Sequence, residues 1–168
     1  MSLFERQKAA LKLKEMDAND LIANIANTFK LKVEKYGGEI DIDLEAEESA
    51  IYIDEMHFTN VLFNLMDNAV KYRRSDVPLK LMARTKNENG KLVLTIEDNG
   101  VGIKKEYLKK VFDRFFRVPT GNVHDVKGFG LGLAYVRKII EDLSGSIRAE
   151  SDINNGTKFI ITLPLIKS

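Results

Sequence analysis

The 168-residue sequence has no cysteine, no tryptophan and only two histidines. The absence of cysteine excludes disulfides, thiolate metal sites and cysteine nucleophiles. The two histidines, His57 and His124, are too few for a metal site built on several imidazoles. No apolar run approaches the length of a membrane span, and no signal-peptide pattern opens the chain.

The chain also lacks an excess of charge of either sign, with 26 Lys and Arg against 25 Asp and Glu. A formal net charge of +1 gives no global attraction to nucleic acid or anionic lipid, so any phosphate binding must be local. The hydrophobic fraction of 44% and the chain length suit one domain whose core needs no disulfide or structural metal.

The polar and apolar pattern predicts both strands and helices. The predicted strands span about 10–15, 40–44, 51–53, 79–85, 92–97, 146–150 and 157–165. The first helix is predicted between the candidate caps Asp17 and Asn19 and a stop at Gly37-Gly38. Two more helices are predicted, over 54–72 with Asp54 as its cap and over 131–143. Leu31 is placed on the apolar face of the first helix, and Asn89-Gly90 predicts a hairpin turn. Strands and helices are interspersed, which predicts a two-layer α/β sandwich with a mixed sheet.

Three asparagines, Asn60, Asn64 and Asn68, recur every four residues in the 54–72 helix, and Lys71 continues the stripe. Asparagine is a mediocre helix former, so propensity does not explain the spacing. An amide oxygen is a neutral ligand suited to Mg²⁺ that shares phosphate oxygens. The alternative, with equal weight for the stripe alone, is a helix flank whose amides bond to neighbouring loops.

Two glycine-punctuated segments follow. Residues 98–103, Asp-Asn-Gly-Val-Gly-Ile, come directly after a strand, where glycines permit close approach of a ligand and Asp98 offers acceptors for an exocyclic amine. Residues 128–133, Gly-Phe-Gly-Leu-Gly-Leu, open a helix whose free N–H groups favour phosphate. Taken singly, the first is also explained by a tight turn and the second by a loop that meets a helix.

Between these loops, Arg114 and Arg117 flank Phe115-Phe116. Arg117 can pair with a phosphate or carboxylate through two hydrogen bonds, while Arg114 is read as a solvated neighbour of core phenylalanines. The joint order is far more specific than any one segment: asparagine stripe, DxGxG, Phe-Arg segment, and GxGxG before a helix.

In this order the sequence resembles the catalytic, ATP-binding domain of bacterial sensor histidine kinases of two-component systems, within the GHKL superfamily. Residues 63–72 resemble the family's N box, 98–103 its G1 box, 111–117 its F box and 128–134 its G2 box. The resemblance covers about residues 10–166 and implies the Bergerat ATP-binding fold, with about three helices against the sheet and a long ATP lid over about 112–130.

The resemblance implies a role for each matched residue. Mg²⁺ would be coordinated by Asn68, with Asn64 assisting at the metal or phosphates, and Lys71 and Arg117 would contact phosphate as catalytic residues. At the base, Tyr72 would pack beside the adenine, Asp98 would accept from its amino group, and Ile103 would contribute an apolar floor. The remaining cofactor-binding residues are glycines and leucines of the two loops: Gly100, Gly102, Gly128, Gly130, Leu131, Gly132 and Leu133.

Hydrolytic relatives carry glutamate where this chain has Asn64, and that glutamate activates water. An amide is not basic enough for this, so hydrolysis should be slow and the bound ATP suited to phosphorylating another nucleophile. The family's phosphoacceptor histidine lies in an H box that this sequence lacks, since neither His57 nor His124 stands in such a context. Phe129 replaces a small polar residue of the G2 box, and Lys127 is a candidate additional phosphate contact.

The resemblance therefore predicts a protein-histidine kinase module that binds ATP and Mg²⁺ and phosphorylates a histidine on a separate dimerisation domain, for relay to a response regulator. Residues 1–9 would be a tag remnant or the end of the preceding dimerisation region, and 10–168 the catalytic domain. We expect a cytoplasmic, monomeric domain without nucleic-acid or direct membrane contact, from a homodimeric parent in the bacterial inner membrane. The alternatives are a GHKL-type ATPase, a nucleotide-sensing module and a serine kinase that acts on a regulatory protein.

Overall fold

The computed structural model describes residues 11–113, 116 and 132–166. The described helices are α2 (Ala18–Lys35), α3 (Glu55–Lys71) and α4 (Gly132–Asp142), with short 3₁₀ turns η1 (Lys105–Tyr107) and η2 (Lys110–Phe112). The described strands are β1 (Lys14–Asp17), β2 (Glu39–Leu44), β3 (Ala50–Ile53), β4 (Lys80–Glu88), β5 (Lys91–Asp98), β6 (Ser146–Ser151) and β7 (Thr157–Pro164).

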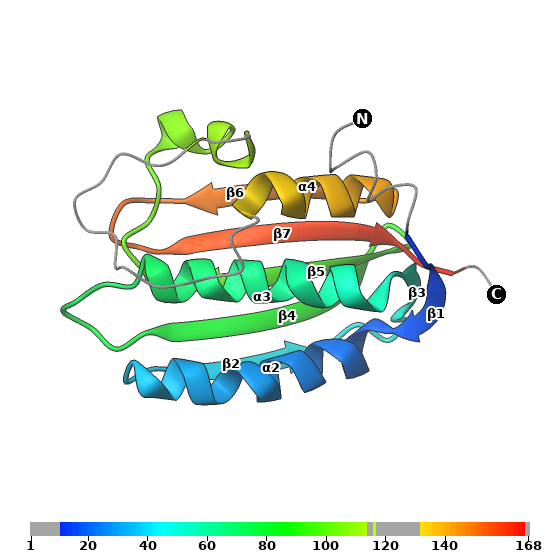
Figure 1. The fold of residues 1–168 in the computed structure, drawn as a ribbon, viewed down its shortest axis with the longest axis horizontal. Coiled ribbons are helices and arrows are strands. Elements are labelled where there is room, and N and C mark those ends of the chain that lie inside the picture. Colours follow the sequence, from blue (N-terminus) through cyan, green and yellow to red (C-terminus); the bar gives the residue numbers. More distant parts are fainter. Residues whose placement is uncertain (1–10, 114–115, 117–131, 167–168) are drawn as a thin grey trace.

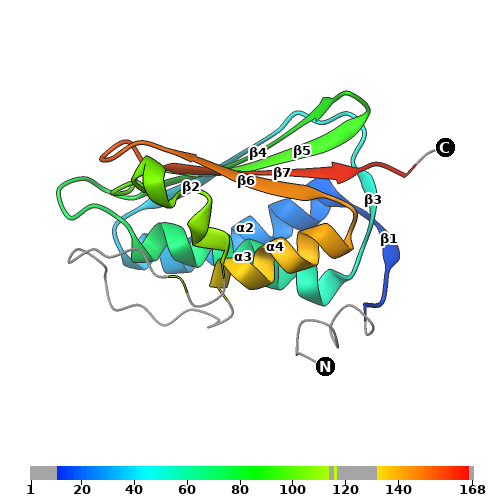
Figure 2. The ribbon, with the colours of Figure 1, turned by 90° about the horizontal axis from the view of Figure 1, so that it is seen from above.

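Five of these strands form one mixed sheet in the order β2-β4-β5-β7-β6. β2 runs parallel to β4, and the other neighbours are antiparallel. The three helices cover one face of the sheet and leave the other open (Figures 1 and 2). The predicted two-layer α/β sandwich with a mixed sheet and three packed helices is confirmed.

The predicted helix starts are confirmed at Asp17 and Asp54. Asn19, the other cap candidate, lies inside α2, and its amide donates to the carbonyl of Ala46 at 3.0 Å. The Asp17 carboxylate accepts from the backbone N–H of Asp20 at 3.0 Å and caps α2. The Asp54 carboxylate accepts from the N–H of His57 at 3.0 Å and caps α3. Burial alone would raise the pKa of Asp54, but the N–H groups of Lys12 and His57 outweigh it and hold that pKa below its usual range. Both caps satisfy first-turn donors that the helix cannot pair.

The strand predicted over 10–15 lies slightly later, at Lys14–Asp17, and does not join the main sheet. It pairs antiparallel with β3, Lys14 opposite Ile53 and Asp17 opposite Ala50. Asn89 and Gly90 both have positive φ, +54° and +75°, and close the predicted hairpin between β4 and β5. A turn with positive φ at both positions matches the twist of the two strands.

The core lies between the sheet and the helices. Helix α3 is central, and its apolar residues Phe58, Val61, Leu62, Leu65, Ala69 and Val70 are all buried, as predicted. The placement of Leu31 is wrong, because its side chain is 77% exposed. Two residues turn an α-helix by about 200°. Leu31 therefore lies on the side of α2 opposite to the buried Phe29. Across the part of the chain that the structure describes, no helix is both long and apolar enough to cross a membrane.

Candidate functional site

Three segments far apart in the sequence meet at one end of the molecule, at the left of Figure 1. They are the C-terminal end of α3, the loop that follows β5, and the turn between β6 and β7. The backbone N–H of Val101 donates to the carbonyl of Tyr72 at 2.9 Å, and the N–H of Asn154 donates to the carbonyl of Val101 at 2.8 Å. The loop after β5 is therefore held between the other two segments.

Helix α3 brings two of the three stripe asparagines to this end in a state to bind a ligand. Asn64 is buried, and its amide nitrogen donates to the carbonyl of Asn60 at 2.8 Å, which leaves its side-chain oxygen to face a partner. Asn68 is half-buried, and within the described ranges its side chain makes no hydrogen bond. Asn60 belongs to a different contact, because its side chain bonds to the hydroxyl of Tyr135 on α4.

The last turn of α3 adds a cation and an aromatic ring. Lys71 is half-buried, and its ammonium lies 5.4 Å from the ring centroid of Tyr72, the C-cap residue. No carboxylate within the described ranges pairs with Lys71, so its charge is available to an anion. An ammonium held over an aromatic face keeps its orientation without being neutralised.

Glycine is required at two positions of the loop after β5. A Cβ on Gly100 would lie 2.5 Å from the carbonyl oxygen of Tyr72, so the loop approaches α3 too closely for any side chain. Gly102 has a φ of +77°, and a Cβ there would lie 2.1 Å from the carbonyl oxygen of Asp152. These contacts give the loop a preformed shape, and Ile103, half-buried, packs against the core at its end.

Asp98, at the end of β5, has an unusual charge state. Burial raises the pKa of its carboxyl to about 7, even though the N–H groups of Gly100 and Thr157 lower it. The Gly100 N–H donates to Oδ1 at 2.8 Å. Asp98 is half-buried, and within the described ranges it forms no ion pair. Such a carboxyl is a candidate for recognising a ligand, because a structural carboxylate is normally solvated or paired.

Sequence reasoning missed the residues that support Asp98 from the β6–β7 side. Gly156 has a φ of +84°, and a Cβ there would lie 1.8 Å from the carbonyl oxygen of Asp98. Ser151 accepts from the N–H of Ile103 at 2.7 Å and donates to the carbonyl of Gly156 at 2.6 Å. Asn154-Asn155-Gly156 shows a turn in the sequence, but nothing local shows that this turn lies against the loop 98–103.

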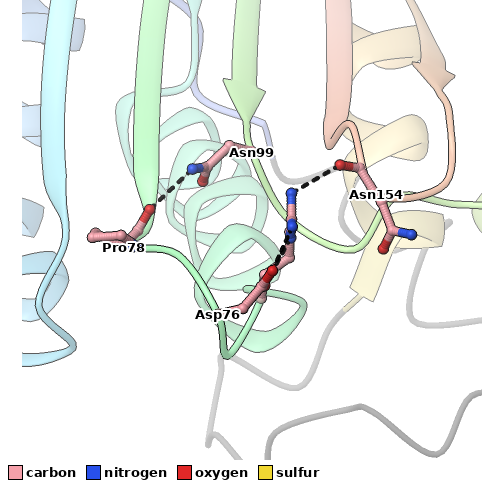
Figure 3. Close-up of polar contacts among 5 residues, drawn as sticks. Asp76, Pro78, Asn99 and Asn154 are labelled. Carbon is pink, nitrogen blue, oxygen red and sulfur yellow. Dashed lines mark hydrogen bonds and ion pairs between the residues drawn. The ribbon is translucent and has the colours of Figure 1, made fainter.

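A second set of contacts, also missed, holds the same loop from the side of residues 73–80 (Figure 3). Asn99 donates to the carbonyl of Pro78 at 2.9 Å and accepts from the N–H of Lys80 at 2.8 Å. Arg74 forms two bonds with Asp76 and donates a third, at 3.0 Å, to the carbonyl of Asn154. The loop is thus connected to both neighbouring segments by side chains as well as by backbone.

Helix α4 begins at Gly132, whose φ of +71° suits glycine, and the half-buried Leu133 follows it. Its buried residue Tyr135 is hydrogen-bonded to Nδ1 of His57 over 2.7 Å. His57 is therefore an interior residue that joins α3 to α4, as expected, and is not exposed to a second protein. The helix N-terminus that follows the glycines is a place where an anion is stabilised.

Several predicted positions lie outside the described residues, including most of the expected lid. They are Arg114, Arg117, His124, Lys127, Gly128, Phe129, Gly130 and Leu131.

The donors at this end fit Mg²⁺ bound together with phosphate. No group of three His, Asp or Glu side chains converges within the described ranges, so a cage made by protein alone is absent there. The unpartnered amide of Asn68 supplies one neutral oxygen. Mg²⁺ commonly takes one or two protein ligands and completes its shell with water and phosphate oxygens.

A family model described as histidine kinase-, DNA gyrase B-, and HSP90-like ATPase matches residues 53–167. Sensor protein RprX of Bacteroides fragilis is 66% identical over 168 residues, which cover all of this chain and 32% of that protein. Sensor protein SrrB of Staphylococcus aureus is 34% identical over 166 residues, 92% of this chain and 28% of that protein. The chain thus spans about a third of the length of these curated relatives.

Solved structures give the same fold. The catalytic domain of histidine kinase ThkA, in a nucleotide-free form, superposes with a TM-score of 0.74 at 28% identity, covering 92% of this chain and 97% of that domain. Histidine kinase ThkA in complex with response regulator protein TrrA matches with a TM-score of 0.74 at 25% identity, covering 93% of this chain and 42% of that one.

Proposed function

The chain belongs to the family of histidine kinase-, DNA gyrase B- and HSP90-like ATPases, and from this premise we propose that it is the catalytic domain of a sensor histidine kinase. Family membership implies ATP binding. The proposed activity is transfer of the γ-phosphoryl group of ATP, bound with Mg²⁺, to a histidine on a separate domain.

One observation carries the proposal: the hydrogen bond from Val101 to the carbonyl of Tyr72. This hydrogen bond holds the loop with the half-buried Asp98 carboxyl at the end of the helix that carries Asn64, Asn68 and Lys71. A nucleotide likewise has an amine-bearing base at one end and phosphates at the other. The carboxyl on the loop and the amide and ammonium groups on α3 therefore suit the two ends of a nucleotide.

The residues would divide the work as follows. The Asp98 carboxylate would accept from the adenine amino group, beside Tyr72 and Ile103, while Gly100 and Gly102 keep the loop close to the base. Asn68 would hold Mg²⁺, which neutralises phosphate charge, and the oxygen of Asn64 would orient a phosphate-bound water or the metal shell. Lys71 and, outside the described residues, Arg117 would stabilise charge that develops on the transferred group. Phosphoryl transfer depends mainly on such positioning and charge stabilisation.

The partners are proposed from the relatives. Because similar proteins are named sensor proteins and one is solved with a response regulator, we propose a histidine-bearing dimerisation domain and a response regulator as partners. The parent protein would be a membrane-bound homodimer with this domain in the cytoplasm. Residues 10–168 would form the catalytic domain, with an ATP lid over about 112–130 and with Gly130 and Gly132 as its phosphate-side hinge.

Titration calorimetry with a non-hydrolysable ATP analogue, with and without Mg²⁺, tests the binding step. We expect one saturable site whose affinity increases with Mg²⁺. Incubation with Mg-ATP and the proposed histidine-bearing dimerisation domain of the parent protein should then label a histidine on that domain. Tight binding without any such labelling would favour the nucleotide-sensing alternative, and absence of binding would overturn the proposal.

ATP hydrolysis by the chain alone should be slow. The oxygen of Asn64 can orient water but cannot take its proton, and a positioned base contributes roughly 10²–10⁴-fold to such a step. Steady-state phosphate release measures this, with the Asn68→Ala variant as the control for contaminating ATPases. A turnover on the order of 1 s⁻¹ that the Asn68→Ala change abolishes would instead identify a true ATPase.

A further inference from the structure

We propose that Arg74 is a positioning residue for adenine recognition, which clamps the β6–β7 turn against the loop 98–103. The inference rests on the proposed function, since it concerns the part of the site assigned to the base. Arg74 lies outside the motifs that identify the site, three residues beyond the end of α3.

Val101 lies in the middle of the loop 98–103 and connects it to both neighbouring segments. Both of its backbone polar groups are used: its N–H donates to the carbonyl of Tyr72 at 2.9 Å, and its carbonyl accepts from the N–H of Asn154 at 2.8 Å. One side of the loop is thus fixed to a helix end, which is rigid. The other side is fixed to the β6–β7 turn, so the position of that side of the loop depends on the position of the turn.

The turn has few other connections. Within the described ranges, two hydrogen bonds tie residues 152–155 to other segments: the one from Asn154 to Val101, and the one from Arg74 to the carbonyl of Asn154. The bond from Asn155 to Asp152 lies inside the turn. Asn154 has a φ of +65°, a left-handed turn conformation that asparagine adopts more readily than most residues with a side chain.

The guanidinium is held in the geometry this contact needs. Asp76 accepts from Nε at 3.0 Å and from Nη2 at 2.6 Å, which leaves Nη1 to donate to Asn154 at 3.0 Å. The Arg74 side chain is 27% exposed, less than half the exposed fraction of its partner. A doubly bonded guanidinium loses little further freedom when it makes a third bond. Hydrogen bonds thus connect Tyr72 to Val101, Val101 to Asn154, and Asn154 to Arg74, which lies two residues after Tyr72. Only the last of these bonds is made by a side chain.

The position of the turn matters for the base because the turn supports Asp98 and Gly102 by direct contact. The carbonyl of Asp152 lies where a Cβ of Gly102 would be, and Gly156 lies against the carbonyl of Asp98. When Arg74 is removed, the turn should move away and the Asp98 carboxyl should lose its fixed direction. Phosphate contacts on α3 do not depend on this turn.

The test measures binding of adenosine, which lacks phosphate, to the full chain and to Arg74→Ala. We expect the dissociation constant to rise about five- to tenfold, the usual net effect of losing one hydrogen bond. Arg74→Lys should recover part of the loss, since lysine can reach a carbonyl but not form the paired contact. In the nucleotide-free protein, amide exchange at Asn154 should become about tenfold faster, with amides of the central strands unchanged.

Arg148→Ala is the matched control, because Arg148 also pairs with an acid two residues later, Glu150, but touches no loop of the site. It should leave adenosine affinity within about twofold. Unchanged adenosine affinity in Arg74→Ala would overturn the inference, as would faster exchange throughout the core, which indicates a general loss of stability. If the unaltered chain binds neither adenosine nor ATP, the proposed function fails, and the role of Arg74 in recognition fails with it. Binding by the unaltered chain together with unchanged Asn154 exchange in Arg74→Ala would overturn the clamp alone.

Discussion

Replacing Asn68 with alanine should remove the effect of Mg²⁺ on nucleotide binding. The Asn68 amide is the protein oxygen assigned to the metal, and within the described ranges it has no other partner. In the unaltered chain Mg²⁺ should tighten ATP binding, while in Asn68→Ala the affinities with and without the metal should coincide. We expect the affinity for Mg-ATP to fall about a hundredfold, at the upper end of the effect of removing a residue that only orients a metal ligand. Calorimetry with a non-hydrolysable analogue measures both affinities.

The fold should survive this substitution, which makes the result interpretable. The Asn68 side chain is half-buried in α3, and alanine is the better helix former by about 0.5 kcal/mol. Asn27→Ala on α2 is the matched control, an exposed helical asparagine remote in sequence from every segment of the site, and it should change neither affinity. If Mg²⁺ still tightens ATP binding to Asn68→Ala, the metal is held elsewhere and the assignment is wrong.

Most of the fold follows from local patterns, since each element buries one face. The alternation in β3, where Ile51 and Ile53 are buried, and the helical spacing in α3 are set by burial, so the sequence displays them directly. The alternation of Ile40, Ile42 and Leu44 in β2 predicts a half-buried strand, but Ile42 is exposed. The errors occur where burial is not the cause. Leu31 is apolar and exposed, and β1 is formed by pairing with β3 at the end of the molecule, which an alternation of leucine and lysine shows only approximately.

The site divides in a similar way. Asp98, Gly100 and Gly102 could be proposed from the sequence because one short motif keeps them together. The structure places Gly100 against the end of α3, and Asp98 and Gly102 against the β6–β7 turn. Arg74 and Gly156 were missed, although they hold the same loop. Their partners lie 80 and 58 positions away in the chain, at Asn154 and Asp98, and no periodicity reports contacts of that range.

Asn60 shows the limit of a stripe as an argument. Asn60 is four residues before Asn64, but its polar groups have partners within the protein. Its carbonyl accepts from the Asn64 amide, and its side chain bonds to Tyr135. Asn60 thus connects α3 to α4 and not to a neighbouring loop. Ligand binding by Asn64 and Asn68 stays a prediction.

The stability of the unaltered chain should fall as the pH rises from about 4 to 7, and Asp98→Asn should remove that component. Burial raises the pKa of Asp98 to about 7 in the folded protein, while an unfolded chain titrates near its ordinary value of 3.8. Between these values the folded state holds a proton that the unfolded state has lost. The contribution is thus complete below about pH 4 and lost by pH 7.

The change should amount to about 1–3 kcal/mol in the free energy of unfolding, after allowance for partial solvent access. Urea unfolding at pH 5 and pH 8 measures it as the difference between the unaltered chain and Asp98→Asn. Asp43→Asn is the control, because this substitution removes the same charge from a residue that is exposed on β2. An equal pH dependence in the unaltered chain and Asp98→Asn would contradict the prediction.

The same proton links the pH to recognition of the base, and here the sign is opposite. An ionised carboxylate accepts from the adenine amino group more strongly than a protonated one, so adenosine affinity should rise between pH 6 and pH 8 as the Asp98 proton leaves. In Asp98→Asn, the side-chain oxygen still accepts from the Gly100 N–H, as Oδ1 does now. The new amide NH₂ group would then face the adenine amino group, and two donors cannot form a hydrogen bond with each other. We therefore expect about a 10–100-fold loss of adenosine affinity at pH 8 and no rise with pH. A variant that binds adenosine as well as the unaltered chain would show that Asp98 supports the loop without touching the base.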